Sequence, residues 1–241
     1  MQVIPLHIEK EIEPSDDLPG LISASSELND GDILVVAQKV VSKQEGRSVD
    51  LSTVTPSLLS EGIGSHYQKD PRIVELILSE TKRIVRMKNG IIIVETKNGT
   101  ICANAGVDES NVQEGYATLL PINSDTSAQT IRDKIKQQSN KNVAVIISDT
   151  FGRPFRMGQT NCAIGISGLN PILDYAGTLD SFKKILRITE IAIADELSSA
   201  AELVMGKVLN CPVAIIRDYS FNAENHMIDE LIRPENEDLF K

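Results

Sequence analysis

Short apolar runs, each bounded by polar turn residues, divide the chain into predicted strands. The clearest runs are "ILVVA" at 33–37 and "VAVIIS" at 143–148, with further runs at 2–6 and in "CPVAIIRDY". The segment "GIIIVETKNGTICANAG" predicts a hairpin, with Asn98-Gly99 as its two-residue turn. The length of these runs and their β-branched residues indicate buried strands.

Apolar residues at helical spacing predict the helices. In "DPRIVELILSETKRIVRM" (70–87), Pro71 suits a first turn and Ile73, Leu76, Ile77 and Ile84 recur on one face. Further helices are expected in "DDLPGLISASSEL", in "SDTSAQTIRDKIKQQ" with a Ser or Asp cap, and over most of 181–209, ending near Gly206. Strands and helices alternate without a regular βαβ rhythm. The sequence therefore predicts an α+β fold with mixed sheets and packed helices. We expect one domain over 1–241, with a possible division into two subdomains at boundaries the sequence does not fix.

Composition narrows the class of protein. The chain has 241 residues, 41% of them hydrophobic, and a net charge of −10, which argues against a general nucleic-acid binder. Its three cysteines are widely separated and form no CxxC pair, so we expect small core cysteines in a reducing compartment. No apolar run approaches the ~20 residues of a membrane span, and the acidic N-terminus lacks a signal core. We expect a cytoplasmic protein without membrane contact.

The first of three polar clusters is "AQKVVSKQEGR". It places Gln38, Lys39, Ser42, Lys43 and Arg47 directly after the 33–37 strand. Lysine ammonium groups suit phosphate. The same residues also fit the solvated face of a helix.

The second cluster is "CANAGVDESNVQEG". Asn104, Asp108, Ser110 and Asn111 supply the oxygen ligands that Mg²⁺ and Mn²⁺ prefer. Asp and Asn are also common turn formers, so a structural loop stays open as an alternative.

The third cluster is "SDTFGRPFRMGQTN" (148–161), which follows a buried strand. Asp149 and Thr150 offer a carboxylate and a hydroxyl side by side, which suits the bridging of two ions. Arg153 and Arg156 offer forked donors for phosphate or carboxylate. A purely structural loop stays open as an alternative, but two nearby arginines would repel each other without an anion, so we expect a functional loop.

Familiar catalytic motifs are missing from the sequence. It contains no G-x-x-x-x-G-K-[ST], no G-x-G-x-x-G, no H-E-x-x-H and no G-x-S-x-G. Any nucleotide must therefore be held by a non-standard set of loops.

The ordered motifs resemble a known family, the coenzyme F420-0:L-glutamate ligases (F420 gamma-glutamyl ligases) of deazaflavin biosynthesis. The matching stretches are "DILVVAQKVVSKQEGR", "KDPRIVELILSE", "CANAGVDESNV", "SDTFGRPFRMGQTNCAIGISG" and "ITEIAIADELSSAAELVMGK". No nitroreductase-like extension follows, so the resemblance is to the stand-alone form. Two positions depart from the family pattern. Phe155 replaces a frequent tryptophan, and Asn161 replaces a common aspartate and removes a charge.

The resemblance implies an activity. A GTP-dependent ligase would add L-glutamate to the lactyl carboxylate of coenzyme F420-0, and then a second glutamate by a γ-linkage. It also implies two divalent cations per site, Mn²⁺ or Mg²⁺, a dependence on K⁺, and an intertwined homodimer of unusual α+β fold. Phosphorylation of the acceptor carboxylate by GTP would give an acyl phosphate, which the glutamate amine attacks.

The resemblance also assigns residues. Asp108 and Asp149 should bind one cation and Thr150 a second. The residues expected to contact GTP are Glu9, Lys10, Glu11, Ile12, Gln38, Lys39, Lys43, Asn111, Met205, Gly206 and Lys207. Charge alone, without the resemblance, suggests that Arg153 and Arg156 clamp the acidic acceptor or the glutamate. With Asp149 they form the predicted catalytic set.

Three other functions stay open at this point. A related GTP- and metal-dependent ligase could act on another carboxylated cofactor. A nucleotide-binding regulator would bind GTP without turnover, and a metal-dependent phosphohydrolase would consume GTP without glutamate.

Overall fold

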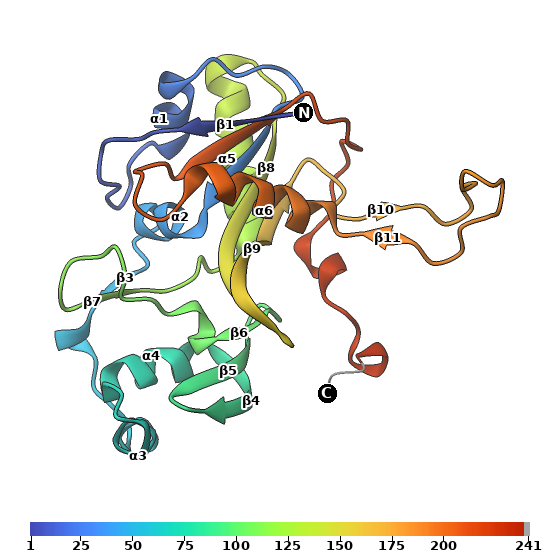
Figure 1. Ribbon diagram of the computed structural model, residues 1–241. Coiled ribbons are helices and arrows are strands. Elements are labelled where there is room, and N and C mark those ends of the chain that lie inside the picture. Colours follow the sequence, from blue (N-terminus) through green and yellow to red (C-terminus); the bar gives the residue numbers. More distant parts are fainter. Residues whose placement is uncertain (239–241) are drawn as a thin grey trace.

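A five-stranded mixed sheet forms the centre of the computed structural model, which describes residues 1–238 (Figure 1). Only β2 and β8 run parallel, and every other neighbouring pair in this sheet is antiparallel. In spatial order the strands are β1 (Gln2–Leu6), β12 (Val213–Arg217), β2 (Ile33–Ala37), β8 (Ala144–Arg153) and β9 (Arg156–Ser167). The predicted strands at 2–6, 33–37 and within "CPVAIIRDY" are confirmed.

Helices cover both faces of this sheet, so its strands are apolar on both sides. Leu34, Val36, Val145 and Ile147 face α1 (Leu18–Ser25) and α5 (Ser124–Ser139) within one buried cluster. The neighbouring residues in the same strands pack with α6 (Ile193–Met205) in a second cluster. The sheet, these helices and the short α2 (Gln38–Gln44) form the large lobe.

A third buried cluster lies in residues 48–119, which we call the small lobe. Here α3 (Leu58–Tyr67) and α4 (Pro71–Glu80) share a core with β5 (Ile91–Thr96), the central strand of a sheet with β4 (Thr81–Lys88) and β6 (Ile101–Ala103). Strands β3 (Ser48–Asp50) and β7 (Tyr116–Thr118) pair where the chain passes between the lobes. Short 3₁₀ turns complete the chain: η1 (Leu51–Thr53), η2 (Asn104–Gly106), η3 (Ile228–Leu231) and η4 (Glu235–Glu237).

Arg47 fixes the crossing between the two lobes. Its Nε donates to the Leu120 carbonyl at 2.9 Å, and its Nη2 donates to Glu80 Oε2 at 2.9 Å. The Leu119 N–H donates in turn to the Arg47 carbonyl at 3.0 Å. Arg47, a member of the first polar cluster, is therefore a structural residue of the lobe junction.

Two long ribbons extend from the large lobe. The hairpin β8–β9 curves past the sheet toward the small lobe, and a separate arm carries β10 (Leu173–Asp174) and β11 (Glu190–Ile191) away from the body (Figure 1). The arm replaces part of the helix predicted over 181–209, of which only α6 forms. Gly206 ends that helix, as predicted.

Other sequence-based boundaries also need correction. The helix predicted over 70–87 stops at Glu80, because residues from Thr81 onward pair with β5 as a strand, and Ile84 lies in β4. The cap of α5 is Asn123, whose side chain accepts from the Thr126 N–H, and neither Ser nor Asp serves. The predicted hairpin forms, but its turn has three residues with Gly99 left-handed, because Thr96 and Thr100 still pair.

The α+β class with mixed sheets is confirmed. The intertwined homodimer and the single domain over 1–241 stay predictions. Within residues 1–238, no helix combines the length and the apolar character that crossing a bilayer requires.

Candidate active site

The parallel pair β2–β8 brings two of the polar clusters to one edge of the sheet. The last pair in its register joins Ala37 and Ser148, so Gln38, which follows β2, and Asp149, which continues β8, lie at the same edge. This edge is where open α/β sheets bind ligands. Strand β8 does not stop there. It continues to Arg153 in the hairpin, so the stretch predicted as a loop after Ser148 is a strand.

Asp108 reaches this edge from the small lobe. Its Oδ2 accepts from Lys39 Nζ at 2.6 Å and from Ser110 Oγ at 2.7 Å, and its Oδ1 accepts from the Ser110 N–H at 2.8 Å. Partial burial opposes ionisation, but the hydrogen bonds from Lys39 and Ser110 outweigh it and hold the pKa of Asp108 below its ordinary value. Asp108 is therefore an ionised, lysine-paired carboxylate.

Asp149 has the opposite electrostatic environment. Burial raises the pKa of Asp149 to about 6, and the nearby charge of Asp108 adds to the effect. The Thr150 N–H, which donates to Asp149 Oδ1 at 2.8 Å, and the charges of Lys207 and Lys39 only partly oppose it. The two carboxylates thus lie near enough to repel each other, and a cation between them would relieve both burial and repulsion.

Thr150 anchors the other side of the hairpin. Its hydroxyl accepts from Lys207 Nζ at 2.6 Å and donates to Asn161 Oδ1 at 2.7 Å. Asn161 pairs with Thr150 across the β8–β9 register and is buried, and its amide nitrogen reaches Ser148 Oγ at 3.4 Å. Lys207, just after α6, is thereby brought to the metal candidates although it is distant in sequence.

Helix α2 presents the remaining cationic side chain of the site. Lys43 pairs with the Glu11 carboxylate and donates to the Asn111 carbonyl at 2.7 Å. Lys39 and Lys43 are four residues apart, so both ammonium groups lie on one face of the helix, about 6 Å apart along its axis. Gln38 is buried and donates to Ser42 Oγ at 2.6 Å and to the Leu119 carbonyl at 3.3 Å.

Several residues predicted to contact a nucleotide offer only backbone atoms. Ile12 and Met205 are buried in the two core clusters of the large lobe. Gly206 has a φ of +58° and caps α6. Among their charged neighbours, Lys10 pairs with Asp16 at 2.6 Å and Glu9 is exposed.

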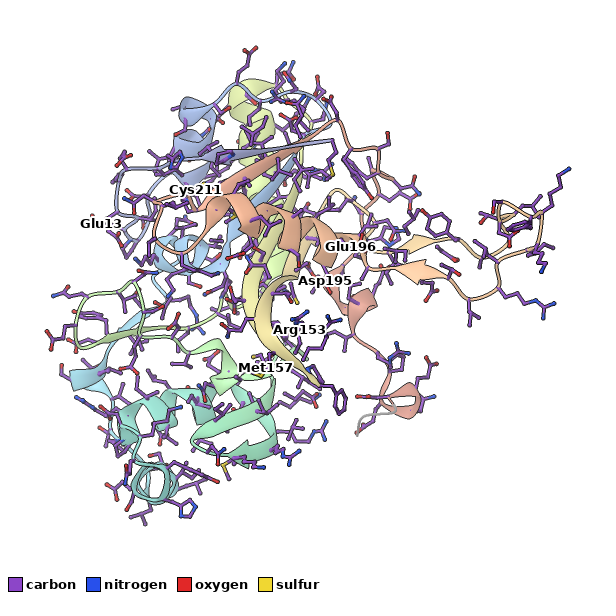
Figure 2. All side chains as sticks on the ribbon, viewed as in Figure 1. Glu13, Arg153, Met157, Asp195, Glu196 and Cys211 are labelled. Atoms are coloured by element: carbon purple, nitrogen blue, oxygen red, sulfur yellow. The ribbon has the colours of Figure 1, made fainter. Side chains whose placement is uncertain are left out.

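The two predicted arginines lie apart from the carboxylates. Arg153 and Arg156 pair across the hairpin tip, and Arg153 Nη2 donates to the Met157 carbonyl at 2.7 Å (Figure 2). Arg153 is four positions along the strand from Asp149, a distance of about 13 Å between their backbones. A clamp role for these arginines stays a prediction, and it requires a substrate long enough to span this distance.

The donor set fits a hard divalent cation that arrives with a nucleotide. Two carboxylates and a hydroxyl are the oxygen ligands that Mg²⁺ and Mn²⁺ take, and Mg²⁺ commonly completes its shell with phosphates and water. Across residues 1–238, no three His, Cys, Asp or Glu side chains gather closely enough to hold a metal by themselves. The protein ligands alone would thus form an incomplete shell.

Cys102 is a neighbour of the site that the sequence did not assign to it. All three cysteines were expected as small core residues, and Cys102 and Cys211 are buried. Burial raises the pKa of the Cys102 thiol to about 12, and the charge of Asp149 contributes. Cys102 is therefore a neutral thiol against the buried carboxylate. The hairpin that carries it was predictable, but its approach to β8 was not.

Comparison with known proteins identifies the family of the chain. The family model described as F420-0:Gamma-glutamyl ligase matches residues 8–218. The coenzyme F420:L-glutamate ligase of Methanopyrus kandleri is 41% identical over 246 residues, covering 100% of this chain and 98% of the relative. The protein of the same name from Methanocaldococcus jannaschii is 45% identical over 215 residues, covering 89% of this chain and 86% of the relative. That of Methanothermobacter thermautotrophicus is 42% identical, covering 94% and 93%. The chain belongs to the F420-0:gamma-glutamyl ligase family.

Proposed function

We propose that this protein is a GTP-dependent ligase that joins L-glutamate to the lactyl carboxylate of coenzyme F420-0, and then adds a second glutamate by a γ-linkage. The observation that carries the proposal is that Lys39 pairs with Asp108 at 2.6 Å while the charges of Asp108, Lys207 and Lys39 all act on the buried carboxylate of Asp149. Family membership supports the acceptor and the amino acid.

The cationic side chains suggest how the triphosphate lies. Asp149, Thr150 and Lys207 would face the γ-phosphate, and Lys39 and Lys43 would follow along α2 toward the remaining phosphates. Asp108 and Asp149 would hold one divalent cation and Thr150 a second, with phosphate oxygens completing each shell. When bound, these ions neutralise charge on the triphosphate and on the transferred phosphoryl group.

The proposed reaction has two steps, phosphoryl transfer and amide formation. An oxygen of the acceptor carboxylate attacks the γ-phosphorus, the bond to the β-phosphate oxygen breaks, and GDP leaves with that electron pair. The glutamate nitrogen next attacks the acyl carbon, phosphate leaves, and the nitrogen loses a proton to form the amide. The chain contributes by positioning charge and excluding water, because the acyl phosphate would otherwise hydrolyse.

A reconstitution experiment tests the activity. The purified chain is incubated with coenzyme F420-0, L-glutamate, GTP and Mn²⁺, and mass spectrometry follows addition of one and two glutamates and formation of GDP. Product in the full mixture supports the proposal. Loss of GTP without glutamate would indicate a phosphohydrolase, and GTP binding without GDP formation would indicate a regulator. Product only with a different carboxylated cofactor would indicate the related ligase.

We also propose a homodimer, and the arm supports it. Its ribbon exposes large apolar side chains at Leu179, Phe182, Ile185 and Ile188, with Phe182 84% and Ile188 90% exposed. An isolated two-stranded ribbon is marginally stable in water, and exposed apolar patches of this kind mark interfaces. A second copy of the chain is the occupant that the family resemblance implies.

Light scattering after size exclusion tests the dimer. The double substitution Phe182→Glu with Ile188→Glu should shift the mass from dimer to monomer, because each carboxylate would be buried in the interface. Lys183→Glu is the matched control on the same arm and should leave the mass unchanged. A wild-type monomer would contradict the proposal.

A further inference from the structure

A left-handed turn precedes Asp108 in the chain. Asn104, Ala105 and Gly106 have φ values of +54°, +53° and +70° in succession. Residues with a Cβ avoid this region, and runs of it are rare outside glycine. Ala105 is also fully buried, so the surrounding structure must hold the turn in place.

Lys69, at the junction of α3 and α4, stabilises the turn through hydrogen bonds. Its Nζ donates to Asn104 Oδ1 at 3.1 Å and to the Gly90 carbonyl at 3.1 Å. Asn104 Oδ1 also accepts from the Ile92 N–H at 3.2 Å. The ammonium thus joins the β4–β5 turn to the left-handed turn. It is only partly exposed, and burial lowers the pKa of Lys69. A lysine that serves only to solvate the surface would not be enclosed in this way.

The same turn borders both carboxylates of the site. The turn follows Cys102 by two residues in the chain, and burial together with the charge of Asp149 raises the pKa of that thiol. On the other side, Asp108 follows two residues after Gly106 and exchanges backbone hydrogen bonds with Thr118 at 3.1 and 2.8 Å. Little room exists for adjustment, because a Cβ on Gly106 would lie 2.5 Å from Leu120 Cγ.

We propose that Lys69 is a positioning residue, whose ammonium fixes the left-handed turn and so sets where the Asp108 carboxylate meets the divalent cation. This inference rests on the proposed function, because it requires that Asp108 bind a cation with the nucleotide. Lys69 does not touch Asp108. It acts through Asn104 and the backbone between the two residues.

Electron paramagnetic resonance of Mn²⁺, titrated into the full chain at fixed GDP, tests the inference without relying on turnover. Lys69→Met keeps the length of the side chain and removes its donors. It should weaken Mn²⁺ binding ten- to hundredfold, as loss of a residue that orients a ligand typically does. The matched control is Lys82→Met, since Lys82 lies in the same lobe, is exposed and pairs with Glu95 at 2.6 Å. It should leave Mn²⁺ binding unchanged.

A second variant separates position from charge. Asn104→Ala leaves the Lys69 ammonium in place but removes the side-chain oxygen that accepts from Lys69 and from the Ile92 N–H, so it should weaken Mn²⁺ binding at least as much as Lys69→Met does. If Lys69 acted only through its charge near Glu109, Asn104→Ala would bind Mn²⁺ as the wild type does, and the positioning role would be overturned.

Hydrogen–deuterium exchange gives a reading that needs no metal. Amides in 103–108 should exchange faster in Lys69→Met than in the wild type, while those of the five-stranded sheet stay protected. Should Lys69→Met fail to fold, Lys69→Arg restores a donor and should bind Mn²⁺ within a few-fold of the wild type. If the wild type binds Mn²⁺ and Lys69→Met binds it equally well, this inference alone is overturned. Absence of Mn²⁺ binding in the wild type overturns the proposed metal site as well.

Discussion

The two carboxylates of the site differ in the lobe that carries them, in burial and in the direction in which their pKa values are shifted. Asp108 lies on a small-lobe loop, about half exposed, and a lysine lowers its pKa. Asp149 lies within a large-lobe strand, and burial raises its pKa to about 6. A site made only of pairs like Asp108 and Lys39 would be satisfied without ligand. Asp149 leaves it with a charge that a cation must balance, so we interpret Asp149 as the residue that couples the protein to metal binding.

Removing that charge should give the largest effect. Asp149→Asn preserves shape and the Thr150 hydrogen bond but loses an ionised ligand. We expect glutamylation to slow by about 10²–10⁴-fold. Initial rates with coenzyme F420-0, glutamate and GTP measure it. Asp133→Asn, on the exposed face of α5, is the control and should have no effect. A near-normal rate in Asp149→Asn would place the chemistry elsewhere.

The same substitution should stabilise the metal-free protein. The pKa of Asp149 is raised in the folded state, so ionisation costs folding free energy as pH rises above 3.8, and the full cost applies above about 6. A shift from 3.8 to about 6 corresponds to about 3 kcal/mol. Urea denaturation at pH 8 should therefore show Asp149→Asn more stable by about that amount. The gain should shrink as pH falls toward 4. An unchanged or lower stability at pH 8 would contradict the buried environment of Asp149.

Proton competition for Asp149 should make cation binding depend on pH. With GDP present, Mn²⁺ affinity should fall about tenfold per pH unit below about 6, where a proton occupies the carboxylate, and level off above it. Asp149→Asn retains the titration of the nucleotide phosphates but loses this contribution, so its profile serves as the baseline. Identical profiles for the two proteins would assign the pH dependence to the nucleotide.

Asp108→Asn should change stability least, and in the opposite direction. The pKa of Asp108 is lowered in the folded state, so its ionised form stabilises the protein above pH 3.8, and that contribution is lost as pH falls. Because the side chain is about half exposed, solvent screens the pair with Lys39 and the loss should stay under about 1 kcal/mol at pH 7. Thermal melting at pH 7 and pH 4 checks the sign. A gain in stability like that of Asp149→Asn would remove the contrast between the two residues.

Local patterns predicted the elements better than their ends. The apolar runs of β1, β2 and β12 needed only composition and length. The helix expected over 70–87 ends early because "TKRIVRMK" forms a strand that pairs with β5. Helical periodicity does not reveal that partner. The arm also escaped prediction, since its apolar residues resemble one face of a helix until their exposure is known.

The sequence located the site residues that lie next to predicted strand ends. It did not reveal the contacts that these residues make with one another. Lys39 follows β2, and Asp149 comes directly after the last residue of β8 that pairs with β2, so their proximity could be inferred once β2 and β8 are neighbours. The pairing of Lys207 with Thr150 depends on where α6 ends over the hairpin, which no short-range pattern encodes. The distance of Arg153 from Asp149 depends on β8 continuing as a strand through a stretch that contains glycine.

The crossing that Arg47 pins has a geometric consequence for the whole molecule. Asp149 belongs to the large lobe and Asp108 to the small one, and Arg47 hydrogen-bonds to Leu120 and Glu80 where the chain passes between the lobes. A rotation of a few degrees about that pivot would alter the gap between the carboxylates by an amount set by their distance from it. The distance between the two carboxylates would therefore depend on the angle between the lobes. The distance between labels on the outer ends of the two lobes would depend on the same angle and would change by more.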